Sequence, residues 1–418
     1  MTPPGDAPPL RIAILNRFAP PDGAPTATAA AELARDLAAA LPRAEITLYA
    51  SSANYRPGTA PQAGPAAEPD WPTRRVASLY AGRWPPARLI ASLLEGWALA
   101  RRAAREADVV ISLTDPPLLS LWVGPACRRW NRRWIEWTLD RYPEFFAAAG
   151  LVSERHPLYR LLVRRDARLR PDAVIGLGAG QLAHLAARRG TLPPSVILPV
   201  GLTSHHSDEA MPSTPTPAAV PPMGPPPPHP GDIPPQAPDA PLTLVYAGNL
   251  GEAHDPAALA AIVGRADPAR FRFAFAVSGR HADRLRRDLA GHPAVSWHER
   301  LTTADLAGAA AHLVSLSGRA THLSVPSKAV TAVCLGRPFL FTGSAEADTW
   351  RDLGAAGWLI AERSDGTLPP AAIDAALAAL ADPAGRVARA AAARALAAGL
   401  QRRRSEALAT LAAIITAL

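Results

Sequence analysis

The chain has 418 residues, a formal net charge of +8 and a hydrophobic content of 48%. This length suffices for two or three domains, and the hydrophobic content is too high for a globally disordered protein. The positive charge suits an anionic partner such as a nucleic acid, a membrane surface or a phosphorylated substrate. The two cysteines, Cys127 and Cys334, are far apart in the sequence, which argues against a disulfide framework and favours a reducing compartment.

The start of the sequence lacks a charged segment followed by an apolar core, so we expect no signal peptide. No uninterrupted apolar run reaches about 18 residues, so we expect no membrane-spanning helix. Together these features predict a cytoplasmic protein.

In chain order, the first predicted unit is a strand within residues 10–18, a turn, and a helix with Leu33, Leu37 and Leu41 on one face. Residues 242–251 open a second unit of the same kind, which ends in glycines before another apolar helix. A buried strand, a turn and an amphipathic helix form the repeating unit of a doubly wound parallel sheet. Because the unit recurs in the second half, we predict an α/β fold with two Rossmann-like domains.

Further short apolar runs predict strands that alternate with helical segments along the chain. They lie at residues 107–113, 133–139, 172–178 and 195–200 in the first half, and at 271–279, 312–316, 338–343 and 357–361 in the second. The final apolar stripe, over residues 405–418, predicts a helix capped by Ser405.

Residues 203–241 are rich in proline, which has no amide donor and a fixed φ angle. This stretch predicts a semi-extended connector, and a proline-rich ligand for a partner module is the alternative. The expected organisation is therefore a first Rossmann-like domain over 1–202, a linker over 203–241 and a second Rossmann-like domain over 242–418.

The end of the strand that opens the second half is a candidate ligand site. In open parallel sheets, ligands bind beyond the carboxyl ends of the strands, where helix N-termini direct amide groups outward. Gly248 and Gly251 would let the backbone approach a ligand closely, and Asn249 would hydrogen-bond it. Alternatively, the glycines only make a tight turn, which is a common packing feature.

Lys328 is the only lysine in the chain, since every other residue among the 44 lysines and arginines is arginine. A short helix is predicted with Pro326 at its first position and its end near Gly336. Lys328 and Ser327 then lie in the first turn, where a cation costs about 0.3–1 kcal/mol unless an anion binds there. Arginine would serve equally as a solvated charge, so the lysine favours an anion site, and a solvated lysine is the alternative.

Several segments, in this order, resemble those of GT-B glycosyltransferases of family 4, in the subgroup active on cell-surface polysaccharides. They are RIAILNRFAPPDGAPT, DVVISLTDPPLLSL, WTLDRYPEFFAAAGL, HPLYRLL and PDAVIGLGAGQLAHL in the first half, and LVYAGNLGEAHD, VPSK and LGRPFLFTG in the second. The likeness covers most of the chain apart from the proline-rich insert. Its specificity lies in the order of the segments.

The resemblance implies two Rossmann-like domains facing a cleft, and transfer of a sugar from a nucleotide diphosphate donor with retention of anomeric configuration. It implies no metal and no cofactor, and the sequence contains no Asp-x-Asp pair. Amides, a helix N-terminus and basic side chains would then stabilise the leaving diphosphate, with Lys328 as a catalytic group. The donor-binding residues implied are Gly248, Asn249, Gly251, Pro326, Ser327, Lys328 and Thr331.

The sequence departs from the family pattern at three positions. The family usually carries glutamates where this chain has Leu323 and Thr331, and often a basic residue near Glu252. A degenerate, non-catalytic scaffold or partner subunit is therefore an alternative function. A nucleotide-sugar epimerase of the same fold is a second alternative, which would need carboxylate pairs for acid–base chemistry.

On the acceptor side, Asp140 and Glu144 follow the strand predicted at 133–139. Asp140 would accept a proton from an acceptor hydroxyl or bind a sugar hydroxyl, which makes it the second catalytic candidate. Alternatively, Asp140 caps a helix that has Glu144 in its first turn. Gly23, in the first loop, would allow close approach of a substrate.

Arginine and tryptophan alternate over residues 128–134, and residues 88–105 combine an apolar face with basic residues. Such chemistry suits an anionic membrane interface, as a lipid-linked acceptor at the cytoplasmic face would require. A packed junction with solvated arginines is the alternative. Base stacking uses the same residue types, but no nucleic-acid module is present, so we expect no nucleic-acid partner. The expected partners are a nucleotide-sugar donor and a lipid-linked or saccharide acceptor.

Overall fold

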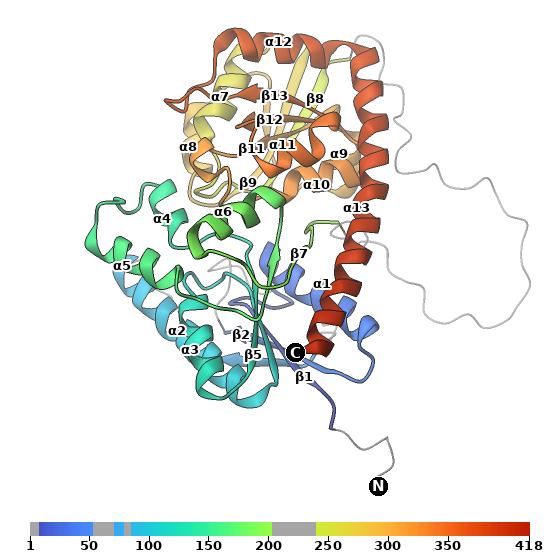
Figure 1. The fold of residues 1–418 in the computed structure, drawn as a ribbon. Coiled ribbons are helices and arrows are strands. Elements are labelled where there is room, and N and C mark those ends of the chain that lie inside the picture. Colours follow the sequence, from blue (N-terminus) through green and yellow to red (C-terminus); the bar gives the residue numbers. More distant parts are fainter. Residues whose placement is uncertain (1–7, 53–70, 79–84, 203–239) are drawn as a thin grey trace, which may run out of the picture. The chain divides into compact units, whose positions relative to one another are not determined.

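The structure is a computed structural model that describes residues 8–52, 71–78, 85–202 and 240–418 (Figure 1). The predicted linker lies outside these residues, apart from its last two positions. Contacts divide the chain into two units. Unit 1 comprises Met1–Val200, His322–Val325 and Arg402–Leu418, and unit 2 comprises Gly201–Thr321 and Pro326–Gln401.

Unit 1 contains a seven-stranded parallel sheet in the order β3-β2-β1-β4-β5-β6-β7. Its strands are β1 Arg11–Leu15, β2 Glu45–Ser51, β3 Thr73–Val76, β4 Val109–Ser112, β5 Arg133–Trp137, β6 Ala173–Gly176 and β7 Ser195–Ile197. Its helices are α1 Pro25–Ala40, α2 Pro85–Glu106, α3 Ser120–Arg129, α4 Glu144–Ala148, α5 Pro157–Asp166 and α6 Ala179–Arg189.

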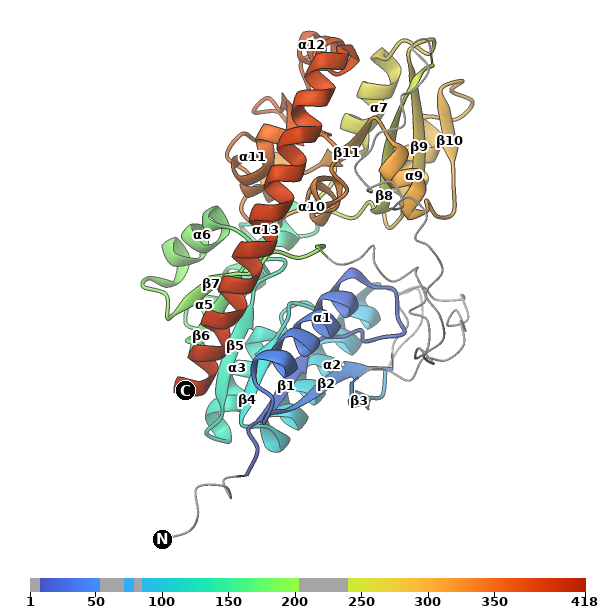
Figure 2. The ribbon, with the colours of Figure 1, turned by 90° about the vertical axis from the view of Figure 1, so that its right-hand side faces the viewer.

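Helices cover both faces of this sheet because alternate strand residues point to opposite sides. Ile12 and Ile14 pack in one core with Leu33 of α1, which lies in front of β1 and β2 in Figure 2. Ala13 and Leu15 pack in the other core with helices α2 and α3. Strands buried on both faces are typical of doubly wound folds.

Unit 2 contains a six-stranded parallel sheet in the order β10-β9-β8-β11-β12-β13. Its strands are β8 Leu242–Asn249, β9 Phe271–Ser278, β10 Val295–Trp297, β11 Ala311–Ser315, β12 Phe339–Gly343 and β13 Gly357–Ala361. Its helices are α7 Pro256–Arg265, α8 Ala282–Asp288, α9 Thr303–Gly308, α10 Ser327–Cys334, α11 Asp348–Leu353 and α12 Pro370–Ala381.

Helix α13 runs without interruption over Pro383–Ala417, so the prediction of a separate final helix capped by Ser405 is wrong. The segment before Ser405 is rich in alanine and arginine, which are strong helix formers, and the helix continues through it. Its last part supplies Ala407, Leu411 and Ile415 to the core of unit 1. Residues 402–418, assigned from the sequence to the second domain, therefore cluster with unit 1, as do residues 322–325.

The predicted fold class is confirmed, and all ten predicted strands are present. Three further strands, β2, β3 and β10, had not been predicted. β3 and β10 are short and are not buried like the others, so they lack the apolar run on which the prediction depended. β2 follows an alanine- and leucine-rich helix with no glycine to mark the boundary.

Candidate functional site

Each sheet has one point where the strand order reverses, between β1 and β4 in unit 1 and between β8 and β11 in unit 2. Loops after such neighbouring strands leave the sheet in opposite directions, and ligands bind at these points in open α/β sheets. The predicted donor-site residues 248–251 lie at the end of β8 and in the loop after it. In unit 1, Gly23 follows β1 and Asp140 follows β5, next to β4.

Lys328 lies in the first turn of α10, as predicted, and its side chain reaches the end of β8. Its Nζ atom donates a hydrogen bond to the main-chain oxygen of Asn249 at 2.9 Å. The same nitrogen lies 5.0 Å from the centre of the Tyr246 ring, a cation–π contact. The lysine side chain therefore contacts the carboxyl end of β8, and it does not extend freely into solvent.

His254 connects the same lysine to strand β11. Its Nδ1 atom lies 2.5 Å from the main-chain oxygen of Ser315, and a carbonyl oxygen only accepts, so Nδ1 carries the proton. In a neutral imidazole Nε2 is then an acceptor, and it lies 3.4 Å from the Lys328 ammonium. Lys328 is thus linked to both strands that flank the reversal point of unit 2.

The ammonium of Lys328 has no compensating carboxylate. Burial lowers the pKa of Lys328 to about 8, and burial together with Lys328 lowers the pKa of His254 to about 3. His254 is therefore neutral at pH 7, while Lys328 is mostly charged. Within the described part of the chain, no carboxylate forms an ion pair with it. A partly buried cation surrounded by neutral acceptors can bind an anion favourably.

Backbone geometry around the lysine requires glycine at two positions. Gly248 has φ +113° and Gly279 has φ +99°, values that residues with a Cβ atom rarely adopt. A Cβ atom at Gly279 would lie 1.9 Å from Oδ1 of Asn249. The Asn249 side chain therefore packs directly on the Gly279 backbone, and Gly251 lies close to it on another side.

Helix α10 begins at Ser327, with Pro326 as its N-cap residue, so the prediction that Pro326 is the first helical residue is wrong. Its φ of −62° suits a helix, but its ψ of 113° is extended, and the helix therefore starts one residue later. Gly336 ends the helix with φ +66°, as predicted. Ser327 and Thr331 lie on the side of α10 next to Gly201.

Two of the residues that depart from the family pattern, Leu323 and Glu252, make contacts of their own in the structure. Leu323 is buried, and its main-chain oxygen accepts a hydrogen bond from the Arg141 amide at 2.9 Å. Glu252, in the loop after β8, pairs with Arg280 at 3.6 Å on the surface, so Arg280 offsets its negative charge.

At the reversal point of unit 1, the structure brings together Arg17, Glu95 and Asp115. The Arg17 amide donates to the main-chain oxygen of Asp115 at 2.7 Å, and the Arg17 guanidinium lies 3.1 Å from the fully buried Glu95 carboxylate. Burial raises the pKa of Asp115 to about 6, with Arg17 opposing the shift and Asp140 adding to it. Asp115 therefore titrates near neutrality beside a second carboxyl group.

Asp115 was missed by the sequence reasoning, although it directly follows a predicted strand in the segment TDPP. Asp140 lies close enough to raise the pKa of Asp115. The Asp140 amide donates a hydrogen bond to Oγ1 of Thr114 at 3.3 Å. Asp140 is not the cap of α4, because Pro143 occupies that position. Gly23 is exposed and a Cβ atom there would meet nothing within 4 Å, so the fold itself does not require glycine at this position.

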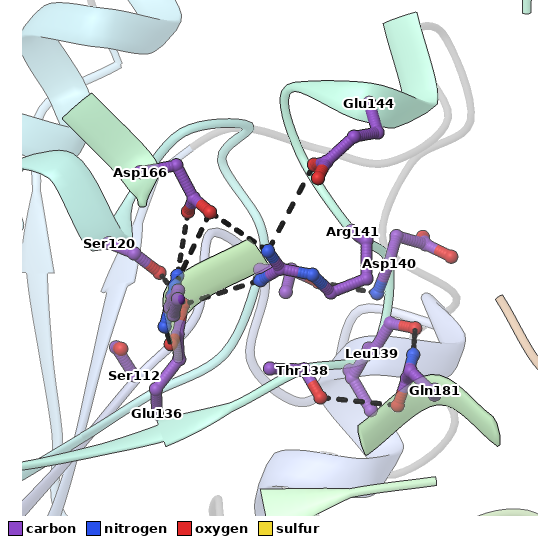
Figure 3. A network of polar contacts seen from close by, with 12 residues as sticks. Ser112, Ser120, Glu136, Thr138, Leu139, Asp140, Arg141, Glu144, Asp166 and Gln181 are labelled. Atoms are coloured by element: carbon purple, nitrogen blue, oxygen red, sulfur yellow. Dashed lines mark hydrogen bonds and ion pairs between the residues drawn. The ribbon is translucent and has the colours of Figure 1, made fainter. Parts of the chain in front are cut away.

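Glu144 belongs to a buried network of charged side chains (Figure 3). Its carboxylate lies 4.0 Å from Arg141, 3.6 Å from Arg188 and 3.9 Å from the His184 ring. Burial alone would raise its pKa, but His184, Arg141 and Arg188 outweigh this effect and lower the pKa of Glu144 to about 2. Glu144 is thus the first residue of α4, as the alternative interpretation predicted, and its carboxylate faces cations.

The centre of the network joins three elements of unit 1. Arg189 of α6 pairs with Glu136 of β5 and, at 2.6 Å, with Asp166 of α5. Arg141 pairs with Asp166 at 2.9 Å, and Figure 3 shows its side chain pointing away from that of Asp140. Buried charges of this kind are tolerated because each has partners of opposite sign. The network therefore fixes the turn that carries Asp140.

The described residues contain no group of three or more His, Cys, Asp or Glu side chains arranged to hold a metal ion. Among the helices that the structure describes, none combines the length and apolar character needed to cross a bilayer.

No family model matches the sequence, and no curated protein matches it. Solved structures, in contrast, match over nearly the whole chain. Sucrose-phosphate synthase from Thermosynechococcus elongatus has a TM-score of 0.65 at 14% identity, over 96% of each chain. WaaG, a glycosyltransferase involved in lipopolysaccharide biosynthesis, has a TM-score of 0.62 at 16% identity, over 97% of this chain and 99% of its own.

A third structure, Anabaena HepE in complex with UDP-glucose, has a TM-score of 0.60 at 15% identity, over 97% of this chain and 100% of its own. These matches and the two parallel sheets define the fold as that of GT-B glycosyltransferases, which confirms the fold that the resemblance implied. The chain thus consists of two Rossmann-like domains of the GT-B type.

Proposed function

We propose that the protein is a glycosyltransferase that moves a sugar from a nucleotide diphosphate donor to a polysaccharide or glycolipid precursor. The observation that carries this proposal is the position of Lys328. Its ammonium lies at the N-terminus of α10, beside the glycine-bearing end of β8, at the strand-order reversal of a Rossmann-like sheet. A diphosphate bound there would meet free helix amides and an uncompensated positive charge.

The chemistry asked of this site is stabilisation of a leaving group. When the bond between the sugar and the diphosphate breaks, negative charge grows on the departing phosphate oxygen. A preorganised ammonium and helix amides stabilise that charge more in the transition state than in the ground state. In this proposal Lys328 and the first turn of α10 supply the neutralising charge without a metal ion or a cofactor.

On the acceptor side, we propose that Asp115 acts together with Asp140. A carboxyl group with a pKa of about 6 is mostly ionised at pH 7, so it can accept a hydrogen bond or a proton from an attacking hydroxyl. Asp140 lies on the next loop and favours protonation of its neighbour. Retention of anomeric configuration rests on the family resemblance alone.

Incubation with a panel of nucleotide sugars, followed by chromatography of the released nucleoside diphosphate, tests the proposal. We expect one or a few donors to be consumed, by hydrolysis or by transfer to a saccharide or lipid-linked acceptor. Consumption should fall strongly in Lys328→Ala. If no nucleotide sugar binds in a thermal-shift screen, the proposal is wrong.

The non-catalytic alternative has one structural observation in its favour. Leu323, where the family carries a glutamate, is an apolar residue packed into unit 1, so no acid can act from that position. Binding of nucleoside diphosphates without any turnover, with every donor and acceptor offered, would favour this alternative.

A further inference from the structure

One buried arginine of unit 2 has no partner of opposite charge. Four arginines are buried in the described part of the chain, and Arg141, Arg189 and Arg404 each pair with a carboxylate. Arg337 differs, because only 3% of its surface is exposed and no carboxylate among the described residues forms an ion pair with it. A buried charge without a partner is strongly unfavourable, so this guanidinium indicates an anionic ligand.

Neutral acceptors do not satisfy the guanidinium of Arg337 either. Its Nε atom is buried and has no hydrogen-bond partner, and the terminal nitrogens donate no hydrogen bond to a described residue. Burial lowers the pKa of Arg386 as well, but Arg386 donates to the main-chain oxygens of Leu380 at 2.8 Å and Ala381 at 2.9 Å. The donors of Arg337 therefore remain available to a ligand.

The backbone fixes Arg337 at the end of helix α10. Gly336 has φ +66°, and the amides of Gly336 and Arg337 donate to the main-chain oxygens of Val333 and Ala332, both at 2.9 Å. This pattern is a Schellman motif, in which the residue after the glycine frequently makes an apolar contact with the helix. The partial negative charge at the helix end favours a cation there. However, none of the described carbonyl groups of α10 accepts a hydrogen bond from this guanidinium.

A second arginine, Arg394 of α13, lies close to Arg337. Burial and the charge of Arg394 both lower the pKa of Arg337. Arg394 is exposed, and no carboxylate in the described part of the chain forms an ion pair with it. An anion would stabilise both cations, since they repel each other and no acid compensates them. Phosphate suits such a pair because its oxygens accept charge-assisted hydrogen bonds from guanidinium groups.

This arginine pair lies apart from the proposed donor site. Lys328 is in the first turn of α10 and Arg337 follows its last turn, so the eight residues of this helix separate them by about 12 Å. β12 begins two residues after Arg337, which places the arginine at the amino end of that strand. The donor residues instead follow the carboxyl end of β8, which lies at the opposite edge of the parallel sheet.

We propose that Arg337 and Arg394 form a binding site for a phosphoryl group, which either free phosphate or a phosphorylated metabolite supplies. The bound phosphate pairs with both guanidinium groups and compensates the buried charge of Arg337. The site goes beyond the proposed sugar transfer, because it lies at the other edge of the sheet from the donor residues and requires no nucleotide.

Calorimetric titration of sodium phosphate into the full chain, at constant ionic strength, tests the site. Arg337→Met should weaken phosphate binding about tenfold or more, because it removes a charge-assisted contact. Arg394→Gln should weaken it at least threefold. Arg402→Gln is the matched control, because it removes the same charge from an exposed position on the same helix, and it should leave binding unchanged. Equal weakening by Arg337→Met and Arg402→Gln would indicate non-specific attraction and overturn the proposal.

Thermal unfolding separates ligand binding from a purely structural role. Without phosphate, Arg337→Met should unfold at the same temperature as wild type or higher, since it removes a buried charge that has no partner. Phosphate should raise the midpoint of wild type and leave that of Arg337→Met unchanged. If Arg337→Met does not fold, Arg394→Gln decides the question, because Arg394 is exposed. Unchanged phosphate affinity in Arg394→Gln would then overturn the proposal.

Two further comparisons identify the source of the phosphoryl group and separate the two sites of unit 2. Tighter binding of glycerol 3-phosphate than of inorganic phosphate would support a phosphorylated metabolite, and equal or weaker binding would support the free ion. Lys328→Ala should keep phosphate binding and lose most of the thermal shift caused by nucleoside diphosphates, whereas Arg337→Met should show the reverse. Phosphate binding that is lost in Lys328→Ala and kept in Arg337→Met would place the phosphate at the donor site and overturn the proposal.

Discussion

The ammonium nitrogen of Lys328 lies 2.9 Å from the main-chain oxygen of Asn249, a residue 79 positions earlier in the chain. This contact joins the first turn of α10 to the end of β8 and accounts for the only lysine in an arginine-rich sequence. A compact ammonium fits beneath the carbonyl and beside the Tyr246 ring, whereas a planar guanidinium needs more space. The site therefore selects lysine by shape.

The lowered pKa of Lys328 predicts a pH-dependent affinity for diphosphates. The free protein loses the ammonium charge as pH rises through about 8, while an unfolded lysine keeps its proton to about 10.5. We expect diphosphate affinity to fall above pH 8, measured by calorimetry between pH 6.5 and 9.5. Lys328→Arg should bind more weakly at pH 7 but show no such fall. An affinity for wild type that is flat across this range would contradict the expectation.

The same shift has a consequence for stability without ligand. Between pH 8 and 10.5 the unfolded chain binds more protons at this lysine than the folded chain does, so the stability of wild type should rise with pH over this window. Lys328→Met removes a buried charge and should be as stable as wild type at pH 7, or more stable. Urea unfolding at several pH values measures both effects, and a large loss of stability in Lys328→Met would show that the lysine has a structural role.

Gly279→Ala should disrupt the donor site through Asn249. The new Cβ atom would overlap Oδ1 of Asn249 and must displace that side chain. Gly291→Ala is the control, because Gly291 also has positive φ but a Cβ atom there meets nothing within 4 Å. Both variants should lose about 1 kcal/mol of stability from backbone strain. Only Gly279→Ala should lose nucleotide binding, and equal binding by the two would contradict this account.

Asp115→Asn tests the acceptor side. The pKa of Asp115 is raised from 3.8 to about 6, so the folded protein binds more protons than the unfolded chain between these values and loses stability as pH rises through them. The variant should be more stable than wild type by about 1–3 kcal/mol at pH 7 and equally stable below pH 4.

If Asp115 takes part in transfer, the same variant should lose about 100-fold or more in kcat/KM. The wild-type rate should then fall as pH decreases through about 6. Full activity in a variant that gains stability would assign Asp115 a purely structural position.

The buried charge network is predicted to stabilise unit 1. Arg189→Met leaves Glu136 and Asp166 without a main partner in the interior, which should cost about 3–5 kcal/mol. Arg133→Gln breaks a more exposed pair with Asp172 and should cost about 0–1 kcal/mol. Thermal unfolding of both variants measures the difference, and similar midpoints would show that the network contributes little.

Local patterns were sufficient to predict the two parallel sheets. Short apolar runs followed by turns and amphipathic helices identify buried strands. A strand covered on both faces has apolar residues at nearly every position and does not alternate between apolar and polar residues. The edge strands β3 and β10 were missed for the same reason, because they are not covered on both faces. β3 carries two arginines on an outer strand, and the register that makes it a strand comes from pairing with β2.

The residues of the proposed donor site could be singled out because they lie in two short segments with unusual composition. The lone lysine and the glycines after β8 stand out in the printed sequence. The contact between Lys328 and Asn249 could not be predicted, because it depends on how the fold places the first turn of α10 beside the end of β8. His254 was missed for the same reason, because its role depends on Ser315 from a third element.

For the proposed acceptor residues, the sequence did not reveal the contacts that the structure shows. Glu144 was singled out by its distance from Asp140 in the sequence, yet its partners Arg188 and His184 come from α6. Asp115 gains its raised pKa from burial and from the loop after β5, and no local pattern reports either effect. Tertiary burial therefore decides which carboxylate titrates near neutrality.

Calorimetric titration of nucleoside diphosphates into wild type, Lys328→Arg and Lys328→Ala at pH 7 tests the central claim most directly. The account predicts that wild type binds at least one diphosphate and binds the matching monophosphate more weakly. Loss of the charge-assisted contact should weaken binding by Lys328→Ala about 10- to 100-fold, with Lys328→Arg between the two. Equal affinity in all three proteins would show that Lys328 does not contact the diphosphate, and the donor site proposed here would be wrong.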